Sequence, residues 1–528
     1  MSERNVIDRV IGFFSPTAAV KRQVARKQLK ILNTGYSNHG ASRSKKSLIG
    51  WVYRGGSTKE DIDDNLDILR QRSRDLYMGT PLATGALKTT RTNVVGAGLR
   101  LKAQVDYEFL GLTDEEADKL EEQIEREFAL WAESVHCDAQ RMNNFYELQQ
   151  LAFLSWLMSG DCFALLPTIP RPQMPYDLRV YLIEADRVCS PNKKEHNGNK
   201  IINGVEIGKY GEVVAYWIAQ KHPLSFEVRE QEWVRVKAFG DLTGRRNILH
   251  LMESERPEQR RGVPILAPVI ESLKQLGRYT EAELMAAVVS GMYTVFIESK
   301  DPAGEVPFGE VIPTELQVDH EDENSYELGN GAIIALGEGE TIKEANPGRP
   351  NSAFDGFVTA ICRQIGAALE IPYELLVKQF TSSYSASKAA LLEAWKMFKM
   401  RRSWLAEDFC QPIYEEWLAE AVAKGRIYAP GFFSDPIIRK AYSGAEWNGP
   451  AQGQIDPLKE VKAAAQRVRE GFSTRAKETA ELTGGDFNKN HRQRVKEEKM
   501  RRQGGLVSNG ESNAQDINET LELQGGDE

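Results

Sequence analysis

The sequence predicts an α+β fold, and three observations support this class. Apolar residues at three-to-four spacing predict helices on both sides of a series of short alternating strands between residues 162 and 252. Two long helices with one apolar face each, residues 264–291 and 352–372, are separated by an acidic insert. A third helix of about forty residues is expected from about residue 385 to 424. With 528 residues, 41% of them hydrophobic, the chain is long enough to bury a sizeable core.

The first half of the chain supplies clear helix and strand signals. Residues 61–90 are expected to be helical with a break at Gly79-Thr80-Pro81, and residues 99–105 alternate like a strand. Two capping boxes predict helix starts, Thr113-x-x-Glu116 and Asn144-x-x-Glu147, with the second helix ending at Gly160. The expected strands cover residues 162–167, 178–188, 204–207, 213–219, 226–228, 234–239 and 247–252.

The second half is expected to be mainly helical. A helix from Pro264 to Gly291 and a helix capped by Ser352 and ended by Pro372 bracket the insert, with strands at 293–297 and 332–336 at its two ends. The forty-residue helix should end at Gly425 and be kinked by Pro412. Three helices follow: the first begins at Asp456-Pro457 and runs to Gly471, the second ends at Gly484-Gly485, and the third begins at Asp486.

Charge is distributed very unevenly along the chain. The overall net charge of −9 argues against a simple nucleic-acid binder, which usually has a basic excess. Residues 1–46 carry a net charge of +8, residues 300–344 carry −10, residues 503–528 carry −6, and the remainder is nearly neutral. We expect a basic arm that is solvated or binds a partner, and a disordered acidic tail over residues 503–528.

Motifs for catalysis and metal binding are weak or missing. The chain has no P-loop, no G-x-S-x-G and no H-E-x-x-H. Ser385-x-x-Lys388 and Ser42-x-x-Lys45 match the S-x-x-K pattern, but the S-D-N and K-T-G partners of that chemistry are missing. We therefore expect no catalytic residue, no enzyme activity, no cofactor and no metal. A serine–lysine peptidase is the alternative.

Other residue patterns favour ordinary structural roles. The acidic run Asp319–Glu323 lacks the spacing of an EF-hand loop, which favours a solvated acidic face over a cation site. Trp395, Trp404 and Trp417 have helical spacing beside Leu and Phe, which favours core or subunit contacts over a stacking surface. Five scattered cysteines without C-x-x-C spacing indicate a reducing compartment. No signal peptide or bilayer-length apolar stretch appears, so we expect no stable membrane insertion.

Several short stretches in a fixed order resemble one known family. They are Leu69–Leu76, Asn93–Leu99, Ile371–Leu375, Ser383–Ser387, Glu393–Trp395, Trp447-x-x-Pro450, Ile455–Glu460, Gly471–Thr474 and Gly485-Asp486. Over residues 45–500 this order resembles the lambda-like family of tailed-bacteriophage portal proteins.

The resemblance implies a ring, usually a dodecamer, at one capsid vertex. Double-stranded DNA, bound without sequence specificity, would enter and leave through the central channel. The implied partners are further copies of the chain, the large terminase subunit, a head-tail connector or adaptor protein, the major capsid protein and a scaffold protein. The implied location is the virion, with assembly in the host bacterial cytoplasm. Two alternatives remain: a serine–lysine peptidase that matures capsids, and a structural scaffold protein without DNA passage.

The resemblance also implies a division of the chain into named parts. The parts are a basic N-terminal arm (1–50), wing (51–262), first stem helix (263–291), clip (292–349), second stem helix (350–372), tunnel loop (373–386), long kinked helix with a return to the wing (387–454), helical crown (455–502) and acidic tail (503–528).

Three groups of residues are the expected functional sites. The DNA-facing tunnel loop would present Lys378, Gln379, Thr381, Ser382, Ser383, Tyr384, Ser385 and Lys388. The acidic clip would present Asp319, Glu321, Asp322 and Glu323 to the channel mouth or to a partner protein. The basic crown helix would face packaged DNA through Lys489, Arg492, Arg494, Lys496, Lys499, Arg501 and Arg502, with a solvated helix as the alternative.

Overall fold

The computed structural model describes most of the chain between residues 55 and 504. The described residues are 55–191, 195–226, 230–291, 295–299, 340–344, 353–380, 383–453 and 456–504, with short pieces between residues 13 and 51. The chain divides into two units, Met1–Asp61 and Ile62–Glu528. Apart from the short helix α3 (Thr58–Asp61), the fold below belongs to the second unit. None of the described helices combines the length and the apolar character that a membrane span requires.

The helices of the predicted wing are α4 (Leu66–Gly79), α5 (Pro81–Val94), α6 (Tyr107–Leu110), α7 (Asp114–Ala132) and α8 (Phe145–Ser159). The helices α7 and α8 begin at their predicted caps, whereas α4 begins five residues later than predicted, α5 ends four residues later, and α6 was not predicted. Pro81 begins α5, which confirms the predicted break. Both capping boxes are present. The side chains of Thr113 and Asn144 accept hydrogen bonds from the backbone N–H groups three residues on, and the carboxylates of Glu116 and Glu147 accept from the N–H groups of Thr113 and Asn144.

The strands form three antiparallel groups in this region. In the first sheet β2 (Asp161–Leu165) lies between β3 (Tyr181–Glu184) and β9 (Ile248–Met252). The second is a five-stranded meander of β4 (Glu195–His196), β5 (Asn199–Ile202), β6 (Val205–Ile207), β7 (Val213–Ala219) and β8 (Trp233–Lys237). The third pairs β1 (Arg100–Ala103) with β12 (Ala445–Asn448), which joins the two ends of the wing.

Two strand predictions need correction. The strand expected over 178–188 is shorter, because residues Ala185–Arg187 turn into a 3-10 helix after β3. The hairpin of β4 and β5 was not predicted, although Asn197 and Gly198 at its tip both have positive φ, which is the requirement of a tight two-residue turn. Most of the strand expected at 226–228 lies outside the described residues.

A cluster of aromatic rings forms the centre of the wing core. The ring of Phe128 lies 5.7 Å from that of Phe145 and 5.1 Å from that of Trp417, measured between centroids. These residues come from α7, α8 and the helix α13 (Gln411–Ala423), so the cluster joins both halves of the chain. Trp417 is fully buried and Trp395 nearly so, which confirms core packing over a stacking surface. Trp404 is half-buried, with its ring near that of Trp156.

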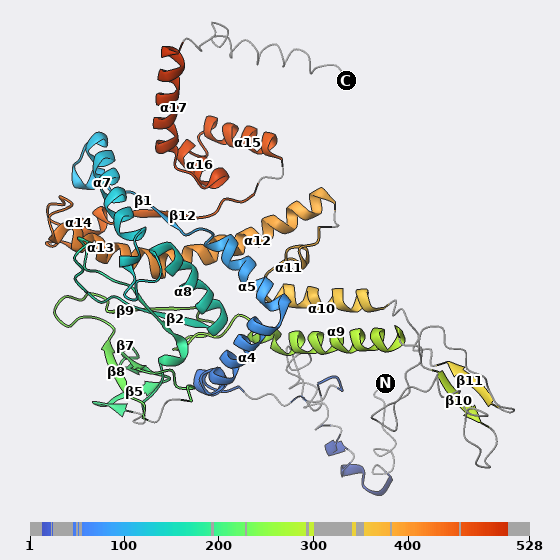
Figure 1. The fold of residues 1–528 in the computed structure, drawn as a ribbon. Helices are drawn as coiled ribbons and strands as arrows, with labels where there is room; N and C mark the ends of the chain where they lie inside the picture. The colour runs from blue at the N-terminus through green and yellow to red at the C-terminus, as the bar shows by residue number, and fades with distance from the viewer. Residues whose placement is uncertain are drawn as a thin grey trace, which may run out of the picture. The chain divides into compact units, whose positions relative to one another are not determined.

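The two predicted stem helices form a hairpin. The helices α9 (Ile270–Gly291) and α10 (Phe354–Ala368) run side by side (Figure 1), with the Tyr279 ring against those of Phe354 and Phe357. The first helix begins six residues later than predicted, because Pro268 lacks the N–H of an α-helical turn and residues 267–269 form a 3-10 turn. The N-cap of α10 is Ala353 rather than Ser352, which lies outside the described residues.

The insert between the stem helices begins and ends in a pair of antiparallel strands. They are β10 (Val295–Ser299) and β11 (Glu340–Glu344), in register from Val295 opposite Glu344 to Ser299 opposite Glu340. The first strand was predicted two residues early. The second predicted strand, 332–336, lies outside the described residues, as do the four acidic clip residues.

The predicted forty-residue helix contains a π-helical segment near the place where the kink was predicted. The helix α12 (Tyr384–Leu405) passes through a π-helical segment (Ala406–Cys410) into α13. Pro412 follows directly, and the N–H of Gln411 reaches back five residues to the carbonyl of Ala406. The interruption lies at the proline, where the kink was predicted. After α13 the short helix α14 (Pro436–Tyr442) leads to β12.

Residues 456–504 form a three-helix unit, which we call the crown unit. Its helices are α15 (Pro457–Arg469), α16 (Arg475–Thr483) and α17 (Phe487–Gln503). The predicted caps Asp456 and Asp486 accept hydrogen bonds from the backbone of Lys459 and Lys489. Arg467 of α15 holds Glu478 of α16 through two hydrogen bonds of 2.8 and 2.6 Å. The Arg467–Glu478 ion pair thus occupies the centre of the crown unit, where a larger unit would bury apolar side chains.

A buried carboxylate joins β2 to α4, to β9 and to the segment that precedes α9. Asp161 of β2 is fully buried, and its Oδ2 accepts from Arg261 Nε at 2.6 Å, from the Gly262 N–H at 3.2 Å and from His250 Nε2 at 3.4 Å. Its Oδ1 lies 3.2 Å from Arg70 Nη2 of α4. Burial alone would raise the pKa of Asp161, but the guanidinium groups of Arg261 and Arg70 hold it well below its usual range.

Arg261 also holds the surrounding backbone in place. Its Nη1 donates to the carbonyl of Val188 at 2.6 Å, and its Nη2 donates to the carbonyl of Ala185 at 2.6 Å. Two glycines permit this approach, since a Cβ on Gly262 would lie 1.9 Å from the carbonyl oxygen of Gly160. The chain therefore leaves the wing toward α9 from a fixed point.

We expect Asp161→Asn to lower the free energy of unfolding by about 3–5 kcal/mol, because it leaves two buried guanidinium groups without their counter-charge. Urea denaturation followed by tryptophan fluorescence measures this change. Asp75→Asn is the matched control: Asp75 and its partner Lys274 are exposed and 4.0 Å apart, so the change there should be below about 0.5 kcal/mol. Equal effects of the two substitutions would contradict the role of the cluster.

Candidate functional site

The predicted tunnel loop lies between α11 (Tyr373–Val377) and α12. It is shorter than predicted, because residues 373–377 form a helical turn and Tyr384 already begins α12. Lys378 ends α11 in the left-handed region with φ of 57°, and the Gln379 N–H donates to the carbonyl of Glu374 at 3.0 Å. Lys378, Gln379 and Ser383 are exposed, whereas Thr381 and Ser382 lie outside the described residues.

Lys388 takes part in an ion pair that the sequence did not reveal. It lies in the second turn of α12, and its Nζ is 3.3 Å from Glu460 Oε1 of α15, with both side chains partly exposed. An amine that donates to a carboxylate is not arranged to accept the proton of a serine hydroxyl. The exposed Ser385 therefore lacks the activated lysine that the S-x-x-K alternative requires.

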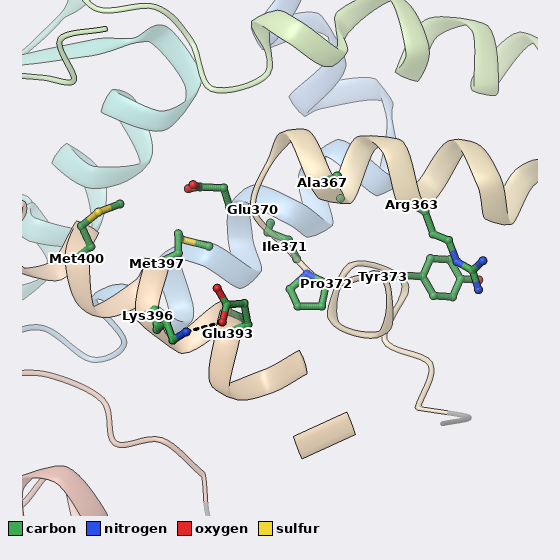
Figure 2. Close-up of a pocket in the computed structure, with 12 residues that line it drawn as sticks. Arg363, Ala367, Glu370, Ile371, Pro372, Tyr373, Glu393, Lys396, Met397 and Met400 are labelled. Atoms are coloured by element: carbon green, nitrogen blue, oxygen red, sulfur yellow. Dashed lines mark hydrogen bonds and ion pairs between the residues drawn. The ribbon is translucent and has the colours of Figure 1, made fainter. Parts of the chain in front are cut away.

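A pocket of about 570 Å³ lies behind this loop, between the end of α10, α11 and α12 (Figure 2). Its apolar surface comes from Ile371, Pro372, Met397 and Met400, among others. The charged lining residues are Arg363, Glu370, Glu393 and Lys396. Lys396 Nζ donates to Glu393 at 2.6 Å, and the Arg363 guanidinium lies over the Tyr373 ring. The lining includes no histidine, cysteine or serine, so it holds no Ser–His or Cys–His pair.

The crown unit is attached to the rest of the unit 62–528 mainly by charge. Besides the Lys388–Glu460 pair, Lys399 Nζ of α12 lies 3.2 Å from Glu481 of α16, and Lys102 Nζ of β1 lies 3.5 Å from Asp486. A fourth pair joins Arg492 of α17 to Glu122 of α7. Within the described part of the crown unit, the buried residues are Ala464 and Glu478. Apolar packing therefore contributes little to the attachment.

The predicted basic residues of the crown lie together on α17. Residues 491–500 are all exposed, and Arg492 pairs with Glu122. Arg501 Nη1 lies 3.4 Å from Glu498 Oε1 one turn before it. In the part of the chain that the structure describes, five of the seven cations form no ion pair: Lys489, Arg494, Lys496, Lys499 and Arg502.

Cysteine and metal chemistry find little support in the described residues. All five cysteines are free, and four of them are buried. Burial raises the pKa of the Cys162 thiol to about 12, which keeps it protonated and unreactive at neutral pH. No group of three or more His, Cys, Asp or Glu side chains that could hold a metal ion occurs among the described residues.

We expect the double substitution Lys388→Gln and Lys399→Gln to release the crown unit. Two partly exposed pairs contribute about 0.2–1 kcal/mol each, so the detached fraction should rise about 2- to 30-fold. Limited proteolysis at the connecting residues 451–456 measures the detached fraction. Potassium chloride at 0.5 M should also accelerate cleavage of the wild type, because it shortens the Debye length to about one third of its low-salt value and so screens the ion pairs.

Lys396→Gln is the matched control for this release. Its pair with Glu393 lies within α12 and does not reach the crown unit, so the cleavage rate should stay at the wild-type value. If neither the double substitution nor salt changes the rate, charge does not hold the crown unit in place.

Residues 44–402 match the model described as phage portal protein, lambda family. Portal protein B of Escherichia phage lambda is 25% identical over 454 residues, which cover 82% of this chain and 84% of the relative. The portal protein of Escherichia phage N15 is 24% identical over 481 residues, covering 87% and 89%.

Two solved structures show a more distant likeness. The neck of the native GTA particle matches with 14% identity and a TM-score of 0.41, covering 79% of this chain and 93% of the other. An HK97 family phage portal protein from Corynebacterium diphtheriae matches with 11% identity and a TM-score of 0.30, covering 69% and 92%. Both scores are low, so the assignment depends on the family match, which spans more than half of the sequence. On that match, the chain belongs to the lambda family of phage portal proteins.

Proposed function

We propose that this portal protein assembles as a closed ring of identical copies at one capsid vertex and encloses the channel through which double-stranded DNA is packaged and ejected. Membership of the lambda portal family supports the role. The structural observation that carries the ring is the uncovered apolar surface of the stem hairpin. Family resemblance suggests twelve copies.

The stem hairpin has an apolar face that its own chain leaves exposed. On the inner side Leu273 and Leu276 of α9 and Ile365 of α10 are buried. Farther along the same helices, Leu284 is 65% exposed, Met285 58% and Phe357 50%. Contiguous exposed apolar side chains mark an interaction surface. A neighbouring copy, related by the rotation of a closed ring, would cover this surface in every subunit alike.

The charge distribution suits a channel that lets DNA move. Each phosphate that a Lys or Arg neutralises adds affinity through counterion release, and a ring multiplies every contact by the number of copies. A nearly neutral body and an insert of net charge −10 would keep DNA weakly bound. In the tunnel loop Lys378 is exposed and would make transient phosphate contacts, whereas Lys388 would have to leave Glu460 to do so.

The finer assignments follow from family resemblance and remain part of this proposal. The acidic clip residues Asp319, Glu321, Asp322 and Glu323 would face the channel mouth or dock the large terminase subunit and later the head-tail connector. The wing would contact the major capsid protein and a scaffold protein. Since the chain has no P-loop, ATP hydrolysis would belong to the terminase motor, and the portal itself would act as a structural component of the virion rather than as an enzyme.

We expect Leu284→Asp to prevent ring formation, because it places a charge in the surface that a neighbouring copy would cover. Sedimentation velocity and negative-stain electron microscopy of the full-length chain measure the assembly state. Leu242→Asp is the matched control, since Leu242 is fully exposed in a wing loop and should leave ring formation intact. Rings that persist in Leu284→Asp would contradict this assignment of the stem surface. Rings with a closed axis would favour a scaffold without DNA passage.

A further inference from the structure

The basic helix α17 presents charge in every direction. All side chains from residue 491 to 500 are exposed, and no residue of α17 is buried. A helix that is polar all round needs many compensating pairs or a partner, since packing of an apolar face usually stabilises a protein helix. Among the described residues, α17 has one ion pair to another element, Arg492 with Glu122.

Like charges follow one another along one side of this helix. Lys496, Lys499 and Arg502 are spaced by three residues, so neighbouring cations lie about 5–6 Å apart between Cβ atoms. No ion pair compensates these three cations in the described part of the chain. We call them the basic stripe. Such repulsion destabilises a helix by about 0.2–0.5 kcal/mol per pair, which an anionic partner would reverse.

An anionic segment follows directly in the sequence. Residues 505–528 begin one position after Gly504 and contain six acidic and no basic side chains. Three of the acids, Asp516, Glu519 and Glu522, repeat with the same spacing of three residues as the basic stripe. Residues 505–528 lie outside the part of the chain that the structure describes.

Length and tethering favour contact within one chain. Twenty-four residues reach up to about 80 Å when extended, whereas the seventeen residues of α17 span about 26 Å. Because the segment is covalently joined to the end of α17, its effective concentration near the helix is in the millimolar range. Weak ionic contacts are then populated without any apolar anchor.

We propose that residues 505–528 fold back onto α17 and mask the basic stripe from DNA. The carboxylates occupy the cations that phosphates would otherwise contact, so the segment acts as a tethered competitor of the DNA backbone. The competition with DNA rests on the proposed function, a ring that encloses DNA, and on the expectation from the sequence that the basic crown helix faces packaged DNA. The contact between the segment and α17 does not depend on it.

Zero-length carbodiimide cross-linking of the full-length protein tests the contact directly. At 50 mM KCl, mass spectrometry should find amide links from Lys489, Lys496 or Lys499 to carboxylates of residues 505–528. The yield should fall several-fold at 500 mM KCl, because the Debye length shortens from about 14 Å to about 4 Å. Absence of these links at low salt, while links between the exposed pair Lys396 and Glu393 form, overturns the proposal.

Binding to a 40-base-pair duplex of mixed sequence tests the masking. A chain ending at Gly504, and a full-length chain with the six acids replaced by amides (E511Q, D516N, E519Q, E522Q, D527N and E528Q), should both bind at least about tenfold more tightly at 50 mM KCl. If five freed cations each contact a phosphate, the slope of log K against log salt should steepen by up to about 4.5.

The truncation and the six amide substitutions are repeated in a chain that lacks the five unpaired cations. This comparison separates the possible outcomes. With K489Q, K496Q, K499Q, R494Q and R502Q, loss of residues 505–528 should no longer change DNA affinity. If truncation changes nothing while these five substitutions weaken DNA binding, the mask is refuted and α17 remains a DNA contact. If the substitutions leave DNA binding of the truncated chain unchanged, the DNA role of α17 fails, and cross-linking alone decides the contact.

Discussion

The buried Asp161 carboxylate is the interaction on which the arrangement of wing and stem depends. It connects α4 through Arg70, β9 through His250 and the segment before the stem through Arg261. In a low-dielectric interior each of these contacts is strong, and each unpaired group would be costly. The strand β2, which carries Asp161, is therefore held in one position relative to α4, β9 and the segment before the stem. Loss of the cluster would release all four together. Since α9 starts nine residues after Arg261, the direction of the stem is set by charge at its base.

Farther from this base, the chain depends on weaker interactions. The stem hairpin leaves part of its apolar surface uncovered, and the crown unit is attached through partly exposed ion pairs such as Lys399 with Glu481. Apolar surface suits permanent contact between copies, whereas exposed ion pairs suit a unit that detaches and returns. The chain thus combines a centre held by buried charge with a crown unit held by partly exposed ion pairs, a combination that would suit the proposed ring.

Much of the fold was predictable because its signals are local. The capping boxes at Thr113 and Asn144, and the caps Asp456 and Asp486, depend on residues three apart, and all four occur as predicted. The missed β4–β5 hairpin also had a local signal, the Asn-Gly pair at 197–198. The late start of α9 could have been read from Pro268. The π-helical segment before Pro412 could not be predicted, because a proline indicates that a helix is disturbed but not the geometry of the disturbance.

The candidate site was less predictable because its contacts join distant residues. Lys388 and Glu460 are 72 positions apart, and Asp161 and Arg261 are 100 apart, so no spacing rule relates them.

The measurement that tests the central claim most directly is electron microscopy of the purified full-length chain. We predict closed rings with an open axis, in which the stem hairpins of neighbouring copies pack along Leu284 and Phe357. Monomers or open filaments at concentrations where the chain is folded would contradict the account.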